Sequence, residues 1–196
     1  MAVEAGARTI EHAIFLTDDG VKYDAALAAR IRDSGIYVNP SNAFAVRATM
    51  GGRTGESEGA GPEFVAELRE ARLETWQLQY QDGVPLIPGS DGGWYATPVQ
   101  DYARMPELMV SEIGMSPSDA LRACTQVAAG AIGMDKELGT IEEGKYADLV
   151  AVDGDPLSDI KNLWNVADVF LRGQRVDRGS EESIAAVRQQ PPENGI

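Results

Sequence analysis

Short apolar runs alternate with helical patterns along the first 133 residues of the chain. Strands are predicted at residues 8–13, 36–38 and 84–88, where an apolar run leads into a polar turn. Between these strands, apolar residues recur with helical spacing over 23–31 and 64–78. Strands that alternate with helices in this way are typical of βα units built around a parallel sheet.

Two further helices are predicted before residue 133. Pro106 is expected near the start of the first. Ser116 is placed to cap the second with its hydroxyl, and Gly133 is placed to end it. The buried stripe predicted for this second helix consists of Leu121, Cys124, Ala128 and Ala131.

After Gly133 the pattern changes to strands and turns, at residues 139–145, 147–152 and 166–171. We therefore expect three parts: an α/β unit at 1–133, a small β unit at 134–177 and a tail at 178–196. The tail contains two consecutive prolines and too little apolar surface to fold alone, so it is expected to be loose.

Composition narrows the range of functions. The 196 residues suffice for one domain or one and a half, and a net charge of −14 disfavours binding to nucleic acids or anionic membranes. No apolar run reaches the length of a membrane span, and the first residues do not resemble a signal peptide, so a cytoplasmic location is expected. A single cysteine, Cys124, has no partner for a disulfide or a thiolate metal site.

Two polar residues follow predicted strands directly. His12, the sole histidine, comes at the end of the first strand, and Asp91 follows the third in the sequence Pro-Gly-Ser-Asp. Parallel α/β barrels present catalytic groups and metal ligands at this end of their strands. Each residue also has a simpler interpretation, because a single histidine is often a buried structural residue and an aspartate before glycine often belongs to a turn.

Four stretches of the chain point to a known family when taken together. They are residues 4–13, 83–91, 114–125 and, most specifically, 139–150, which reads Gly-Thr-Ile-Glu-Glu-Gly-Lys-Tyr-Ala-Asp-Leu-Val and is followed by Gly-Asp-Pro-Leu. In this order they resemble the C-terminal portion of the amidohydrolase superfamily, in the branch that contains imidazolonepropionases and prolidases. The resemblance extends over about residues 4 to 177.

The resemblance implies a TIM (β/α)8 barrel and a small β-sandwich. Residues 1–133 would supply the last three βα units of the barrel, and residues 134–177 the C-terminal part of the sandwich. His12 corresponds to the histidine ligand of strand six, and Asp91 to the aspartate of strand eight, which is both a metal ligand and the catalytic proton acceptor. The family implies a divalent metal, usually zinc, and hydrolysis of C–N bonds in a small-molecule amide, cyclic amide or dipeptide.

The family's other ligands, paired histidines on strand one and residues of strands four and five, have no counterpart in this sequence. Because zinc normally takes three or four protein ligands, we expect the chain alone to bind metal weakly or not at all. We expect activity to require a matching N-terminal half, and the chain alone to self-associate. The alternative hypothesis is a catalytically inert truncated barrel or an interaction module. Candidate substrate-binding residues are Asn39, Asn42, Trp94 and Tyr95.

Overall fold

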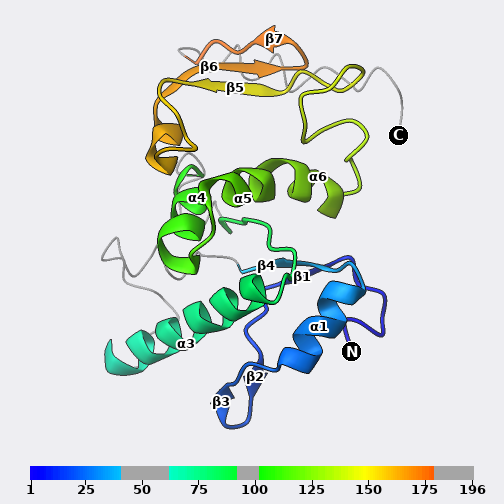
Figure 1. Cartoon of the computed structure of the whole chain (residues 1–196), viewed down its shortest axis with the longest axis vertical. Coiled ribbons are helices and arrows are strands. Elements are labelled where there is room, and N and C mark those ends of the chain that lie inside the picture. Colours follow the sequence, from blue (N-terminus) through cyan, green and yellow to red (C-terminus); the bar gives the residue numbers. More distant parts are fainter. Residues whose placement is uncertain (41–61, 92–101, 179–196) are drawn as a thin grey trace.

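The first part of the fold is a small parallel sheet covered by helices. The computed structural model describes residues 1–40, 62–91 and 102–178 (Figure 1). Strand β1 (Thr9–Glu11) pairs in parallel with β4 (Tyr37–Asn39), and Leu86 forms a parallel bridge with Val38 on the other side of β4. The predicted third strand is reduced to this bridge, because two prolines lie within it and proline has no N–H to donate.

Two helices pack beside this sheet (Figure 1). Helix α1 (Ala25–Asp33) begins where the Asp24 side chain accepts a hydrogen bond from the Leu27 amide at 3.0 Å. It ends before Gly35, which has a φ of +65° that suits glycine. Helix α3 (Pro62–Gln81) is the long helix predicted over 64–78. The structure also has an unpredicted antiparallel hairpin of β2 (Leu16–Thr17) and β3 (Gly20–Val21).

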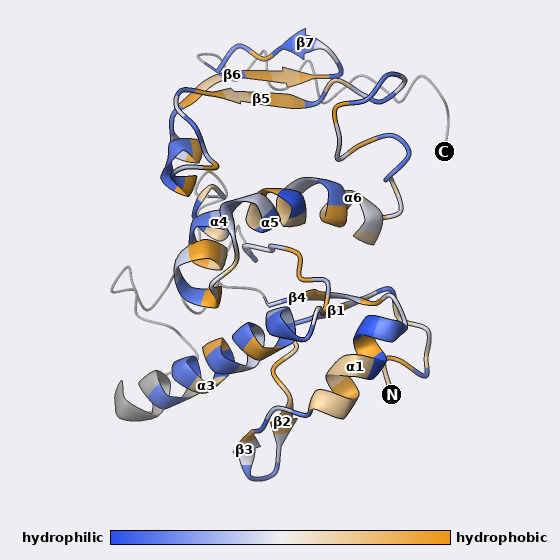
Figure 2. Cartoon of the chain, viewed as in Figure 1, coloured by the Kyte–Doolittle hydropathy of each residue, from blue (hydrophilic) through white to orange (hydrophobic). Residues whose placement is uncertain are grey.

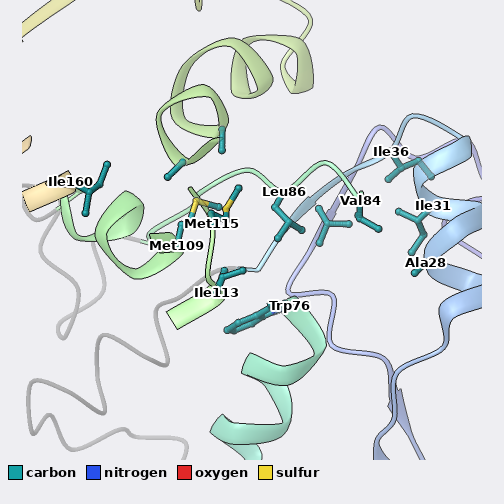
Figure 3. Close-up of a cluster of buried hydrophobic side chains, with 13 residues drawn as sticks. Ala28, Ile31, Ile36, Trp76, Val84, Leu86, Met109, Ile113, Met115 and Ile160 are labelled. Carbon is teal, nitrogen blue, oxygen red and sulfur yellow. The ribbon is translucent and has the colours of Figure 1, made fainter. Parts of the chain in front are cut away.

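The hydrophobic core lies between the sheet and the helices (Figure 3). Val38 is fully buried in the central strand, and Leu86 and Trp76 are each at most 3% exposed. Buried residues of α1 and of the segment 109–123 belong to the same cluster. The core thus joins residues from the predicted βα units into one packed body.

Beyond residue 101 the chain forms a series of short helices. They are α4 (Arg104–Leu108), the π-helical η3 (Met109–Ile113), α5 (Pro117–Arg122), the π-helical η4 (Ala123–Val127) and α6 (Ala128–Ala131). Ser116 caps α5 as predicted, by accepting a hydrogen bond from the Asp119 amide at 3.0 Å.

The buried stripe predicted for this region is largely wrong. Ala131 is buried, but Leu121, Cys124 and Ala128 are half-buried and line a groove of about 530 Å³ beside strand β5 (Leu149–Val152). The fully buried positions include Ala120, Ala123 and Ala129 instead. Apolar residues thus lie on two faces of this helical stretch, with Ala120 and Ala123 in the core and the half-buried residues along the groove.

The C-terminal β unit is a three-stranded antiparallel sheet. Its strands are β5, β6 (Val166–Leu171) and β7 (Gln174–Arg175), in the order β5-β6-β7. Residues 139–145 form turns and loops without a strand. The 3-10 helix η5 (Ile160–Trp164) connects this unit to the rest, since Ile160 joins the main core and the Trp164 Nε1 donates to Glu107 Oε2 at 3.0 Å.

Two long-range hydrogen bonds, here called the Arg8 clasp, join Arg8 to the C-terminal end of α6. Arg8 donates from Nε to the Ala131 carbonyl at 2.9 Å and from Nη2 to the Gly130 carbonyl at 2.6 Å. These are the carbonyls at the C-terminal end of α6, where a positive charge is favourable. In the described parts of the chain, no helix has both the length and the apolar character needed to cross a membrane.

Candidate active site

Three neighbouring strand ends form the candidate site. Because β1, β4 and the Leu86 bridge run in parallel, their carboxyl ends meet at one edge. His12 follows β1 directly, and its amide donates to the Asn39 carbonyl at 2.9 Å, which extends the β1–β4 pairing by one bond. Asp91 lies at the end of the segment that continues from the Leu86 bridge. The two predicted ligands therefore come from the two strands that flank β4.

Both residues have an unusual backbone conformation. His12 has a φ of +57° and Asp91 a φ of +49°, in the left-handed region that side chains other than glycine rarely adopt. Two other non-glycine residues among those described, Phe15 and Arg172, share this property. Strained backbone that the surrounding structure maintains is frequent at functional sites. The conformation supports a functional interpretation of His12 and Asp91 that is independent of sequence resemblance.

The backbone beyond His12 is held by two buried side chains of α3. The Ala13 carbonyl accepts hydrogen bonds from Trp76 Nε1 at 3.2 Å and Gln79 Nε2 at 3.3 Å. Trp76 is 2% exposed and Gln79 is completely buried (Figure 3 shows Trp76). Local sequence reasoning missed both residues, because nothing in the pattern of α3 relates them to a carbonyl more than 60 residues earlier.

The remaining predicted residues divide into two groups. Asn39 lies at the same strand edge, where its Nδ2 donates to Glu11 Oε2 at 2.6 Å. Sequence analysis did not select Glu11, although its position beside His12 at a strand end was a usable signal. Asn42, Trp94 and Tyr95 lie outside the described residues.

The donor chemistry is compatible with zinc but incomplete. Imidazole nitrogen and carboxylate oxygen are both zinc ligands, and a zinc site uses three or four protein ligands. Within residues 1–40, 62–91 and 102–178, no group of three or more histidine, cysteine, aspartate or glutamate side chains could hold a metal ion. His12 and Asp91 are both exposed. They are consistent with part of a metal site that needs further ligands.

Comparison with known proteins identifies the family. The model of the amidohydrolase family matches residues 2–176, and the chain belongs to that family. It is similar to imidazolonepropionase of Shewanella piezotolerans, with 24% identity over 169 residues, which is 85% of this chain and 31% of that protein. It is 38% identical over 100 residues to imidazolonepropionase of Thermoplasma volcanium, covering 48% of this chain and 24% of that protein.

Solved structures give the same result at the level of the fold. A Xaa-Pro dipeptidase with bound methionine superposes with a TM-score of 0.70 and 28% identity, over 89% of this chain and 41% of the dipeptidase. The ochratoxinase of A. niger superposes with a TM-score of 0.71 and 23% identity, over 90% of this chain and 38% of the ochratoxinase. The chain thus spans less than half of these structures, and less than a third of the two imidazolonepropionases.

Proposed function

We propose that this chain carries the C-terminal part of the catalytic site of a metal-dependent amidohydrolase. The substrate would be a small-molecule amide, cyclic amide or dipeptide, hydrolysed at a C–N bond. The observation that carries the proposal is the parallel order of β1, β4 and the Leu86 bridge, which brings His12 and Asp91 to one edge with left-handed backbones. Membership of the amidohydrolase family supports the reaction class.

In this proposal His12 and Asp91 have distinct tasks. The His12 imidazole would be a metal ligand, and Asp91 would be both a ligand and the general base. A bound divalent metal, for which we favour zinc, lowers the pKa of its water toward neutrality. Asp91 would accept the proton of the attacking water and return it to the leaving amine, which is a role that a carboxylate can fill in both directions.

The proposal also assigns the parts of the chain to the family's architecture. We assign β1, β4 and the segment around Leu86 to the sixth, seventh and eighth strands of a TIM barrel formed in part by residues 1–133. Residues 134–177 would form part of the β-sandwich, with 178–196 as a tail beyond it. The missing ligands would come from an N-terminal half, on the same or a second polypeptide. The small share of each relative that the chain covers supports this assignment.

Complementation tests this function. The chain is mixed with the N-terminal half of a prolidase-like relative and offered a panel of dipeptides and cyclic amides. We expect turnover only in the mixture, its loss on chelation, and a decrease of about 100-fold or more in Asp91→Asn, the usual range for loss of a general base. Hydrolysis by the chain alone that survives both chelation and Asp91→Asn would contradict the proposal.

A second candidate is an inert or interaction module that has kept the fold. The observation that favours it is the lack of a third ligand near His12 and Asp91 in the described residues. The same complementation separates the two functions, since an inert module stays inactive with every N-terminal half while it still binds one of them.

A further inference from the structure

Glu11 and Asn39 form a polar pair at the ends of β1 and β4. They are direct partners in the parallel register. Ile10 and Val38, which precede them, pack in the hydrophobic core, and side chains alternate along a strand, so Glu11 and Asn39 lie on the opposite face. On that face the amide nitrogen of Asn39 donates to the Glu11 carboxylate at 2.6 Å. A charged acceptor makes such a hydrogen bond stronger than one between neutral groups.

Gly89, in the segment that follows the Leu86 bridge, lies against the side-chain amide of Asn39. A Cβ atom built on Gly89 would lie 2.0 Å from Asn39 Nδ2 and 2.7 Å from its Cγ and Oδ1. Only a residue without a side chain fits there while Asn39 keeps its hydrogen bond to Glu11. Gly89 does not have a left-handed φ, so the requirement for glycine is one of space. Asp91 is two residues further along.

This contact matters because the segment around Leu86 is weakly joined to β4. Two backbone hydrogen bonds connect them, from the Val38 amide to the Pro85 carbonyl and from the Ile87 amide to the Val38 carbonyl, each 2.9 Å long. Pro85 and Pro88 have no N–H with which to extend this ladder. The register of the segment beyond Ile87 therefore depends on side-chain contacts such as that between Asn39 and Gly89.

We propose that Asn39 is a positioning residue for the metal ligands, an inference that rests on the proposed function. Its carbonyl holds the His12 amide, its side chain is oriented by Glu11, and that side chain packs on Gly89. Asn39 thereby fixes the spacing of the strand ends that carry His12 and Asp91. This role is distinct from the direct substrate contact suggested by the sequence for Asn39, which stays a prediction.

Three variants of the full chain test the proposal. Gly89→Ala pushes the Asn39 amide off Glu11 without altering either residue. Asn39→Asp places two carboxylates against each other, which repel at neutral pH. Combining Asn39→Asp with Glu11→Gln restores the hydrogen bond with donor and acceptor exchanged. Glu143→Gln is the control, an exposed carboxylate in the segment before β5.

The first measurement is amide hydrogen exchange at His12 and Ile87, whose N–H groups bond to β4. We expect at least tenfold faster exchange in Gly89→Ala and Asn39→Asp at pH 7, and wild-type exchange in the double variant and in Glu143→Gln. Unchanged exchange in both single variants would overturn the proposal, as would a double variant no better than Asn39→Asp. If Gly89→Ala fails to fold, the comparison of Asn39→Asp with the Asn39→Asp, Glu11→Gln double variant still tests the proposal.

The second measurement separates this inference from the function on which it rests. Zinc is titrated to millimolar concentration while the imidazole resonance of His12 is followed, which is unambiguous because the chain has one histidine. We expect zinc to bind at least fivefold more weakly to Gly89→Ala than to the wild type, and the double variant to match the wild type. Equal zinc binding by Gly89→Ala and the wild type would overturn the positioning role. If the wild-type resonance does not respond in the chain alone, the same titration is made in the mixture with the N-terminal half, and no response there would overturn the metal site of the proposed function.

Discussion

The left-handed backbone at His12 and Asp91 links a conformational cost to a position at the candidate site. For residues other than glycine this conformation costs roughly 1–2 kcal/mol. Aspartate and histidine are among the residue types that tolerate it best. Phe15 and Arg172 share this conformation, so it is the combination with a strand end of the candidate site that distinguishes His12 and Asp91.

A stability measurement tests this cost. We expect Asp91→Gly to keep or raise the free energy of unfolding, by up to about 1 kcal/mol, because released strain exceeds the added chain entropy of glycine. The control is Ser118→Gly in α5, where φ is helical and a loss of about 0.5 kcal/mol is expected. Urea unfolding of both variants measures these changes in the free energy of unfolding. A loss at Asp91 as large as that at Ser118 would show that no strain is stored there.

Metal content tests the ligands directly. We expect chain purified without added metal to contain far less than one equivalent of zinc, because two ligands do not complete a zinc site. Elemental analysis measures the zinc content of the purified chain. Near-stoichiometric zinc that disappears in His12→Ala would contradict this expectation, and would mean that residues outside the described ranges supply ligands.

At the residue scale, the sequence was informative about groups that follow strands and uninformative about what holds them. His12 and Asp91 were selected because a strand end is a local signal. Trp76 and Gln79, which hold the Ala13 carbonyl, were not, because their role depends on how α3 packs against β1. Contacts between distant segments leave no periodic trace in the sequence.

At the scale of elements, helix starts were predictable and helix faces were not. Ser116 caps α5 as its sequence suggested, since capping is a local interaction. The stripe that includes Cys124 follows from regular helical spacing, but apolar residues occupy two faces of this stretch, and spacing alone does not show which face meets the core. Similarly, the hairpin of β2 and β3 is too short to produce an alternating pattern.

The start of α5 also yields a pH-dependent prediction. Asp119 accepts hydrogen bonds from Ser116 Oγ and Tyr80 Oη, both at 2.8 Å, and these lower the pKa of its carboxyl group. A carboxyl whose pKa is lower in the folded than in the unfolded state stabilises the fold above its unfolded pKa. That contribution is lost as the pH falls through the folded value.

We therefore expect Asp119→Ala to lower the free energy of unfolding at pH 7 by about 1–2 kcal/mol, the usual contribution of hydrogen bonds such as the two that its carboxylate accepts. The difference from the wild type should shrink as the pH falls below the ordinary aspartate pKa of 3.8. Urea unfolding across this pH range provides the measurement, with Ser118→Ala as the neighbouring control. A difference that does not change with pH would show that the carboxylate charge is unimportant.

At the scale of the molecule, the parallel sheet and the three-stranded sheet have edges without a partner strand among the described residues. One edge of β1 and one edge of β5 are unpaired in this way. Strand β5 is entirely apolar, as Figure 2 shows, and Val150 is 61% exposed. Ile132 and Ile141, which are 66% and 89% exposed, line the adjoining groove. Open edges with apolar side chains favour association.

We expect the chain alone to self-associate at low micromolar concentration, or to melt without a sharp transition. Light scattering combined with a thermal melt gives the measurement. Val150→Lys, on the edge strand, should reduce association, whereas Leu157→Lys adds the same charge at an exposed position outside the strands and should not. A strictly monomeric wild type with a cooperative melt would exclude this expectation.

The clasp made by Arg8 bears on how the chain acquires its structure during synthesis. Its partners, Gly130 and Ala131, are 122 and 123 residues later. At the usual rates of translation, roughly ten seconds pass between the emergence of the two sides of the clasp. During that interval the Arg8 guanidinium lacks these two partners, so this contact of the segment before β1 forms late. Nascent chains stalled before residue 130 should therefore be cut by protease near Arg8, while released chains resist.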